Sequence, residues 1–466
     1  MRFRNVPGPF LLILALGAGL PPAAAGGFVA TGTMVTARQK AVATPLADGR
    51  VLITGGRISP AAASKTRKAE LYDPATGTFT ATGDMLTARQ DHTAVRLADG
   101  RVLVFNGGDL FAPLNDVPPT LAELYDPVTG TFTATAAPLV ERDLASATLL
   151  ADGRVIVAGG RGCNPCADLG GGVFTLRDTD VVELYDPATG QFVAAGTLSS
   201  SRGLATVTAL VDGGAVVIGG NREEFIDDGG AVTIVNHPLA TAERFDPVTG
   251  ALVPLAGTMA TARAGHAAAA LADGRVLVAY GALDAQQTLV PAAVEVLDPA
   301  AGTFTAVGTP VPDRPIFGLA VTLAGGSVLF AGGDGGLAAS ADVYDVAGGT
   351  LAGGLPMLRK HLYHVVAPLP DGRALVAGGL DPDNPPVPRG GAQLYDPDLV
   401  PDPLFADDFE APPVHRVAAE SGAPAGSDCP FALPAAVRRG ASGVVERLLV
   451  RTADGRICSV HYVPES

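Results

Sequence analysis

The chain has 466 residues, of which 47% are hydrophobic and 17% are charged. This composition excludes intrinsic disorder and provides material for a large buried core. The 59 Gly and 38 Pro residues disfavour long helices. Acidic residues outnumber basic ones by 47 to 32, giving a net charge of −15, and Trp is absent. These features argue against a nucleic-acid partner, because acidic surfaces repel phosphates and few aromatic side chains are available to stack on bases.

The first predicted element is a signal peptide at residues 1–25. Arg2 and Arg4 precede an apolar run from Phe10 to Leu20, and Ala23-Ala24-Ala25 supplies the small residues of a cleavage site. The apolar run is too short to span a bilayer. We therefore expect an exported protein, periplasmic or extracellular, with no membrane insertion once the signal is removed.

Residues 28–398 repeat one pattern seven times, in units of about 53 residues. Each unit contains an arginine, an apolar strand, a turn that is usually Asp-Gly and a second apolar strand. A glycine pair follows, which we place at Gly107-Gly108 in the second unit and at Gly281-Ala282 in the fifth, and then a variable segment. A third strand ends near Tyr-Asp-Pro. Asp-Gly between apolar runs predicts a hairpin, and Asp-Pro-x-Thr-Gly predicts the turn into a fourth strand. Four-stranded units of this length close radially into a β-propeller.

A family resemblance follows from these motifs. The glycine pair followed by Tyr-Asp-Pro, as at Gly55-Gly56 and Tyr72-Asp73-Pro74, resembles the kelch family in its bacterial variety, which is similar to the central domain of galactose oxidase. The resemblance implies an all-β fold, a seven-bladed kelch-type β-propeller over residues 26–398. It does not imply one function, because propellers support unrelated activities.

The two ends of the propeller are predicted to meet in one blade. The seventh unit lacks a fourth strand after Tyr395-Asp396-Pro397, and a matching sequence, Phe28-Val29-Ala30-Thr31-Gly32, stands at the start of the mature chain. We expect this N-terminal strand to close the last blade.

Residues 399–466 are predicted to form a small C-terminal β appendage, with a hairpin turn around Asp454-Gly455. Because exported proteins meet an oxidising environment, the four cysteines predict disulfides. Proximity in the chain suggests pairing Cys163 with Cys166 in a loop and Cys429 with Cys458 in the appendage. A redox or metal role for Cys163-Asn164-Pro165-Cys166 is the less favoured reading, because a redox C-x-x-C begins a helix.

One arginine stands at the start of each predicted inner strand. In a propeller these side chains would form a ring at the channel mouth, a candidate binding site for carboxylates, sulfates or acidic peptides. The alternative is structural pairing within or between blades, because each unit except the last also has an acid two residues before Tyr-Asp-Pro or its equivalent. The arginines are Arg38, Arg89, Arg142, Arg202, Arg263, Arg314 and Arg359, and the acids are Glu70, Glu123, Glu183, Glu243, Glu295 and Asp342, with Gln393 in the seventh unit.

The longest variable segments, residues 161–183 and 221–243, are a second candidate surface, because rigid scaffolds carry function on their loops. The acids Glu223, Glu224, Asp227 and Asp228 lack the spacing of an EF-hand, so we predict no metal there.

Tyr363-His364 resembles the Tyr-His pair of the galactose oxidase copper site. However, His364 lies seven residues before Asp371, just as His92 and His266 precede their own hairpin turns, so the histidine is a repeat position. Gln39-Lys40 and Asp91-His92 stand where the cross-linked tyrosine of that family is expected, and no cysteine precedes Cys163.

We predict a non-enzymatic, monomeric binding protein without cofactor, metal or catalytic residues. It would recognise a protein or carbohydrate, with an anionic ligand as one option, through the loop face and channel mouth. The alternatives are an acidic-sugar mutarotase or lyase and a copper radical oxidase.

Overall fold

The computed structural model describes residues 26–59, 64–108, 121–168, 174–227, 232–281, 292–311, 319–332, 340–359, 361–380, 388–399, 447–451 and 457–461. The predicted signal peptide and Arg314 lie outside these residues. The chain divides into two compact units, Met1–Pro401 and Asp402–Ser466, and each is described by itself. Every regular element in the described residues is a β-strand. No helix long and apolar enough to cross a membrane occurs in this part of the chain.

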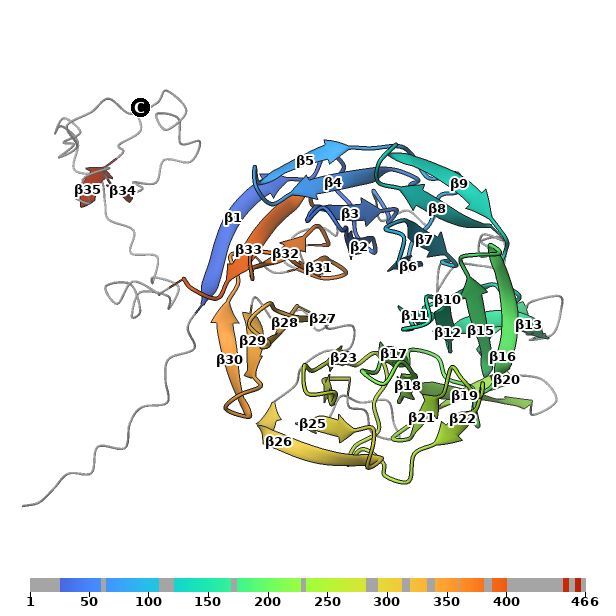
Figure 1. Ribbon diagram of the computed structural model, residues 1–466. Helices are drawn as coiled ribbons and strands as arrows, with labels where there is room; N and C mark the ends of the chain where they lie inside the picture. Colours follow the sequence, from blue (N-terminus) through green and yellow to red (C-terminus); the bar gives the residue numbers. More distant parts are fainter. Residues whose placement is uncertain are drawn as a thin grey trace, which may run out of the picture. The chain divides into compact units, whose positions relative to one another are not determined.

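The first unit is a ring of four-stranded antiparallel sheets with a β-propeller-like arrangement (Figure 1). The described residues form seven such sheets, which we number along the chain. The first strand of each sheet contacts the first strand of the next, and β31 of sheet seven contacts β2 of sheet one, so the ring is closed. The all-β fold predicted from the repeat is therefore present.

In sheets one to six the strands run outward in chain order, and sheet seven differs only in its outermost strand. Sheet one contains β2 (Val42–Pro45), β3 (Val51–Thr54), β4 (Ala69–Asp73) and β5 (Thr78–Ala81); sheet two contains β6 (Thr93–Arg96), β7 (Val102–Phe105), β8 (Ala122–Asp126) and β9 (Thr131–Thr135); sheet three contains β11 (Ser146–Leu149), β12 (Val155–Ala158), β15 (Val181–Asp186) and β16 (Gln191–Thr197). Sheet four contains β17 (Thr206–Ala209), β18 (Ala215–Ile218), β21 (Ala242–Phe245) and β22 (Leu252–Pro254); sheet five contains β23 (Ala267–Ala270), β24 (Val276–Ala279), β25 (Ala292–Asp298) and β26 (Thr303–Val311); sheet six contains β27 (Leu319–Thr322), β28 (Val328–Ala331), β29 (Ser340–Asp345) and β30 (Thr350–Pro356). Sheet seven contains β31 (Val365–Pro368), β32 (Ala374–Ala377), β33 (Gly391–Asp396) and β1 (Gly27–Thr33).

The predicted turns create these sheets. Gly49 has φ 89°, the conformation that the Asp-Gly turn requires, and the Asp48 carboxylate accepts a hydrogen bond from the Arg50 amide at 3.1 Å. The second strand of every sheet is buried over all four residues. Continuous apolar runs suit strands that are covered on both faces.

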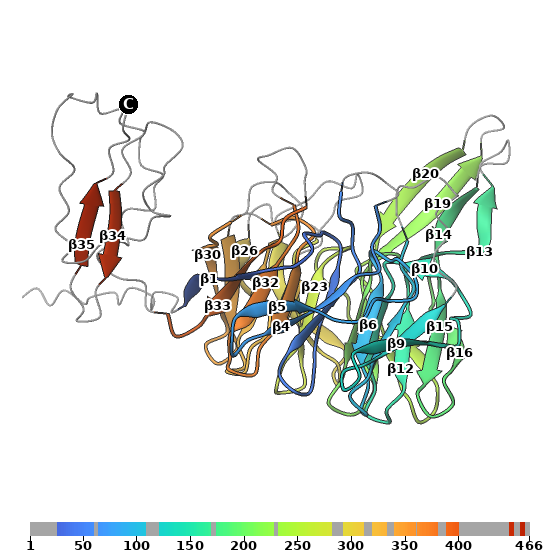
Figure 2. The same ribbon diagram turned by 90° about the horizontal axis from the view of Figure 1, so that it is seen from above.

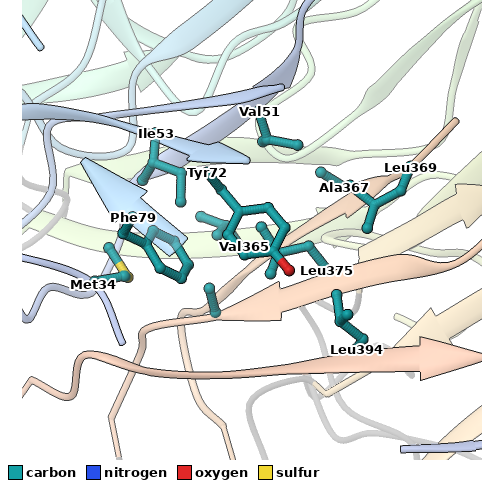
Figure 3. Packing of buried hydrophobic residues seen from close by; sticks show 11 residues of the cluster. Met34, Val51, Ile53, Tyr72, Phe79, Val365, Ala367, Leu369, Leu375 and Leu394 are labelled. Carbon is teal, nitrogen blue, oxygen red and sulfur yellow. The ribbon is translucent and has the colours of Figure 1, made fainter. Parts of the chain in front are cut away.

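Hydrophobic cores lie between neighbouring sheets. Figure 3 shows Tyr72 of sheet one packed with Val365 and Leu375 of sheet seven. The hydroxyl of Tyr72 also forms a 2.8 Å hydrogen bond with Thr31 of β1. Tyr185 makes the same link to Thr135 in the fourth strand of the preceding sheet, and Tyr125 makes it to Thr82, directly after the fourth strand of sheet one. The repeated tyrosine therefore joins adjacent sheets.

The N-terminal strand pairs where the sequence predicts. β1 is antiparallel to β33, with Gly27 opposite Asp396 and Phe28 opposite Tyr395. The aromatic rings of Phe28 and Tyr395 are 5.5 Å apart. The two ends of the ring are thus hydrogen-bonded in one sheet.

Two extensions rise from one face of the ring at sheets three and four (Figure 2). A three-stranded sheet contains β10 (Arg142–Asp143), β13 (Arg161–Asp168) and β14 (Phe174–Asp178), and a hairpin contains β19 (Asn221–Asp227) and β20 (Val232–Pro238). These extensions are formed by the long variable segments.

In the second unit, β34 (Arg447–Arg451) and β35 (Ile457–His461) form the predicted antiparallel hairpin, with Val450 opposite Cys458. Cys429 and the side chains of Cys163, Cys166 and Cys458 lie outside the described part of the structure, so both disulfides stay predictions.

The glycine pairs need one correction. In sheets two and five the left-handed pairs are Asn106-Gly107 and Tyr280-Gly281, one residue earlier than the sequence pattern places them. Asn tolerates the left-handed region. Tyr280 is held there while its hydroxyl donates a hydrogen bond to Asp342 of sheet six.

Candidate functional site

Five of the predicted ring arginines are buried, and each pairs with the glutamate of its own sheet. Arg89 is typical: its guanidinium donates to the Asn106 carbonyl at 2.9 Å and lies 3.0 Å from the Glu123 carboxylate. The exposed fraction of all ten paired side chains is at most 3%. The pairs are Arg38–Glu70, Arg89–Glu123, Arg142–Glu183, Arg202–Glu243 and Arg263–Glu295.

The glutamates also hold the chain that leads into each inner strand. Glu183 accepts a hydrogen bond from the Leu139 amide at 2.7 Å, and Glu243 accepts one from the Ser199 amide at 3.0 Å. Each pair therefore ties the first and third strands of one sheet to the connection from the sheet before it. This geometry corresponds to the structural alternative for the arginines; ligand binding by them stays a prediction.

Sheet seven breaks the pattern and corrects one residue assignment. Arg359 is exposed. The repeat position belongs instead to His361, whose Nδ1 lies 2.7 Å from the carbonyl oxygen of Gly378, 17 residues later, the spacing found for the arginines. The sequence pattern placed the arginine two residues too early, because histidine was not recognised as its replacement. Gln393, at the position of the glutamate, accepts a hydrogen bond from the Leu358 amide at 2.9 Å.

A ring of left-handed residues lies at the start of the inner strands, two positions after each buried arginine or His361. The Lys40 amide donates to the Tyr363 carbonyl at 2.8 Å, and the Asp91 amide donates to the Lys40 carbonyl at 3.2 Å, which links sheets seven, one and two. These residues define one mouth of the ring. The non-glycine members are Lys40, Asp91, Leu144, Leu204 and Tyr363, with φ between 48° and 56°.

Polar side chains converge on this mouth. The Lys40 ammonium lies 2.9 Å from the Asp91 carboxylate and 5.2 Å from the centre of the Tyr363 ring. Gln90 donates to Asp91 at 3.3 Å. Lys40 and Asp91 are 11% and 13% exposed, so the group is largely withdrawn from water.

Asp143 is the most unusual acid at the mouth. Its side chain is fully buried, and neither carboxylate oxygen has a hydrogen-bond partner among the described residues. Burial raises the pKa of Asp143 to about 7, while the positive charge of Arg161 opposes the shift. Carboxyls with strongly perturbed pKa values concentrate at functional sites.

The extensions complete this group of charges. The Asp178 carboxylate accepts a hydrogen bond from the Glu223 amide at 3.0 Å, and Arg161 pairs with Glu223 at 3.3 Å. Burial and the charge of Glu223 raise the pKa of Asp178 to about 8. We call Lys40, Asp91, Asp143, Arg161, Asp178 and Glu223 the mouth cluster.

Sequence reasoning found part of this cluster. It named the long segments and Glu223, but missed Asp143 and Asp178. One signal was available for Asp143: an acid directly follows the repeat arginine in this unit, where Gln39 and Gln90 occupy the position in the first two units. No pattern indicated that Asp178, from the far end of an insertion, returns to the mouth.

The residues present do not fit a copper centre of the galactose oxidase type. Burial lowers the pKa of His92, His266 and His364 to about 3. The Nε2 atoms of His92 and His266 bond to threonines of the preceding sheet, and Nε2 of His364 lies 3.2 Å from the Ala331 carbonyl oxygen. The histidine is thus a repeat position, as predicted. The described residues include no group of three or more His, Cys, Asp or Glu side chains arranged to hold a metal ion.

Comparisons with known proteins show similarity only at the level of the fold. No family model matches the sequence, and no curated protein matches it. Among solved structures, the chain resembles a fungal alcohol oxidase of the AA5 family in complex with copper, with 14% sequence identity and a TM-score of 0.53. The match covers 80% of this chain and 76% of the oxidase.

Proposed function

We propose that the protein is an exported, monomeric, seven-bladed kelch-type propeller that binds a carbohydrate at the mouth cluster. The scaffold is supported by seven four-stranded sheets in a closed ring. The site is supported by charged groups of both signs, gathered where the inner strands begin and where the two extensions rise. Binding sites commonly combine a concave scaffold with a few convergent polar groups.

The buried carboxylate of Asp143 carries the proposal. Two neighbouring groups also offer buried acceptors without a partner among the described residues, Oε1 of Gln90 and Oε2 of Glu223. Unmet buried acceptors are costly, and a ligand that brings several donors relieves that cost. Sugar hydroxyls are such donors.

A glycan array probed with the mature protein tests the proposal, followed by calorimetric titration of the best ligand. Asp143→Asn keeps the side-chain size and should weaken binding about tenfold or more, because it replaces one carboxyl oxygen with an NH2 group that cannot accept a hydrogen bond from the ligand, and an unmatched buried polar group costs about 1–3 kcal/mol. Asp152→Asn, in an exposed turn, is the matched control. Equal binding by wild type and Asp143→Asn, or binding of no glycan, would contradict the proposal; a protein captured in place of glycans would favour protein recognition.

A second candidate is the acidic-sugar mutarotase or lyase, favoured by two carboxyls, Asp143 and Asp178, whose pKa values lie near neutrality. Such groups can exchange protons with a substrate. Anomer exchange of a uronic acid, followed by NMR, would reveal this activity in the wild type and show its loss in Asp143→Asn. Release of hydrogen peroxide by copper-loaded protein would instead support the oxidase.

A further inference from the structure

Three residues of the mouth cluster stand in a row across the three-stranded extension, whose strands β10, β13 and β14 are labelled in Figure 2. Asp143 of β10 is opposite Arg161 of β13, and Arg161 is opposite Asp178 of β14. Side chains of directly opposite residues project from the same face of a sheet, with Cβ atoms about 4.5–5.5 Å apart. The row therefore places one carboxyl on each side of Arg161.

The two cations of the mouth cluster are already paired with other acids. The Lys40 ammonium lies 2.9 Å from the Asp91 carboxylate, and the Arg161 guanidinium lies 3.3 Å from the carboxylate of Glu223 on β19. The two carboxyls that flank Arg161 have no ion pair among the described residues. A ligand with a positive charge would therefore complement the cluster.

Several acceptor atoms of the cluster also lack a donor. Both carboxylate oxygens of Asp143 and Oε2 of Glu223 are buried without a hydrogen-bond partner among the described residues, and so is Oε1 of the neighbouring Gln90. Asp143 is fully buried, so bulk water does not supply the missing donors, and such unmatched acceptors are costly. An ammonium group carries three donors and no acceptor, whereas a hydroxyl brings one donor.

The protonation of the two flanking carboxyls agrees with a missing cation. Burial raises the pKa of Asp143 to about 7, and burial together with the charge of Glu223 raises the pKa of Asp178 to about 8. The other acids of the cluster add to these shifts, and its two cations oppose them. A bound ammonium would favour the ionised carboxylates, so it would take the place of protons that leave to the solvent.

We propose that the mouth cluster selects an amino sugar with a free ammonium group, which binds beside the carboxyls of Asp143 and Asp178. This inference rests on the proposed function, because it names the class of carbohydrate that the same site takes. The ammonium supplies both the donors and the charge that the cluster lacks. A hydroxyl at the same carbon brings no charge, and an acetamido group replaces the charge with an acceptor.

Three trisaccharides with the same β-1,4-linked backbone test the inference, because they differ only in the group at C2. The glucosamine trimer has an ammonium group there, cellotriose has a hydroxyl and the N-acetylglucosamine trimer has an acetamide. Calorimetric titration of the mature protein at pH 7 measures the three affinities. We expect the glucosamine trimer to bind about tenfold more tightly than the other two, or better, because its hydrogen bonds to the carboxylates are charge-assisted.

Asp178→Asn should reduce the preference for the glucosamine trimer over cellotriose about tenfold, since it removes one of the two carboxyls and keeps the side-chain size. Asp180→Asn is the matched control, because Asp180 is exposed and lies only two residues further along the chain. It removes the same charge and should leave the preference unchanged. Titration in phosphate and in HEPES, which differ in ionisation enthalpy, measures the protons released; we expect release by the wild type and less by Asp178→Asn.

The inference is overturned if cellotriose or the acetylated trimer binds as tightly as the glucosamine trimer, a result that would leave the carbohydrate site itself standing. It is also overturned if no trimer binds, if Asp180→Asn lowers the preference as much as Asp178→Asn, or if binding releases no protons. Failure of the proposed function is distinguishable, because it would show as a glycan array on which nothing binds.

Discussion

At the scale of single residues, the buried Arg–Glu pairs position the chain more than they stabilise it. Removing two charges from water offsets most of their attraction, so a buried pair contributes little compared with an apolar one of equal volume. Breaking it is costly, because the remaining charge is buried alone. From the joint repetition of Arg and Glu, without any geometry, the sequence offered such pairing as the alternative to a ring of ligand-binding arginines.

Glu183→Ala should therefore destabilise the protein by about 3–5 kcal/mol, because Arg142 would lose its partner in a fully buried site. Denaturant unfolding of the mature protein measures the change. Asp152→Ala, which breaks the partly exposed pair with Arg154, should cost less than about 1 kcal/mol. Equal losses in the two variants would show that the buried pair has no special role.

Asp143 should make stability depend on pH. Its carboxyl has a pKa of about 7 in the folded protein, against about 3.9 in an unfolded chain. Between these two pKa values the folded state keeps a proton on Asp143 that the unfolded state releases. The contribution of Asp143 to the free energy of unfolding is therefore fully present below about pH 4 and is lost as the pH rises to 7.

Asp143→Asn removes this loss. The variant should be more stable than the wild type at pH 8, by on the order of 4 kcal/mol, and the difference should shrink towards pH 4. Unfolding free energies at pH 4, 6 and 8 measure it. A difference that does not change with pH would contradict the raised pKa of Asp143.

At the scale of elements, the glycine pairs set how closely neighbouring sheets approach. Gly159 and Gly160 follow the second strand of sheet three, and the Gly160 amide donates to the Arg202 carbonyl at 2.9 Å. A Cβ on Gly159 would lie 2.5 Å from that same carbonyl oxygen. Glycine is required there both for its positive φ and for this contact.

Gly159→Ala should consequently lower the free energy of unfolding more than Gly153→Ala does. Gly153 also has positive φ, 88°, but a Cβ added there meets nothing within 4 Å. We expect a loss of stability of about 1 kcal/mol for Gly153→Ala, from the strained backbone alone. For Gly159→Ala we expect a loss of about 3 kcal/mol, because packing is also disrupted. Thermal unfolding compares them; matching values would mean that the contact between sheets is unimportant.

The sequence predicted the order of strands and turns because each rests on local chemistry, such as the positive φ of Gly49. It misplaced the left-handed pairs at Asn106 and Tyr280, because the first position of each pair holds a residue other than glycine, so the search for two glycines began one residue too late. Arg161, Asp178 and Glu223 meet only because two insertions fold over the same mouth. No local pattern could place these three side chains together.

At the scale of the whole molecule, closure of the ring depends on seven residues at its beginning. β1 supplies the outer strand of sheet seven, and Thr31 of β1 is hydrogen-bonded to Tyr72 of sheet one. This closure was predictable because one unit lacked a strand that another part of the chain supplied.

Deleting residues 26–33 should lower the melting temperature by about 10 °C or more, because β33 loses its partner and Tyr72 its hydrogen bond. Differential scanning calorimetry measures the shift. A chain ending at residue 401 lacks only the second compact unit and should melt like the full protein. An unchanged melting temperature after the N-terminal deletion would refute closure by β1.

The pairing of β1 with β33 also makes this protein prone to strand exchange. Until β1 docks, β33 presents an unpaired edge, and such edges accept any strand of suitable sequence. The β1 of a second molecule matches it as well as its own does. At high concentration, or with a shortened connection after β1, two copies would trade this strand and form a swapped dimer without any new interface. The pairing of β1 with β33, which completes the monomer, is thus also the place where one copy can join another.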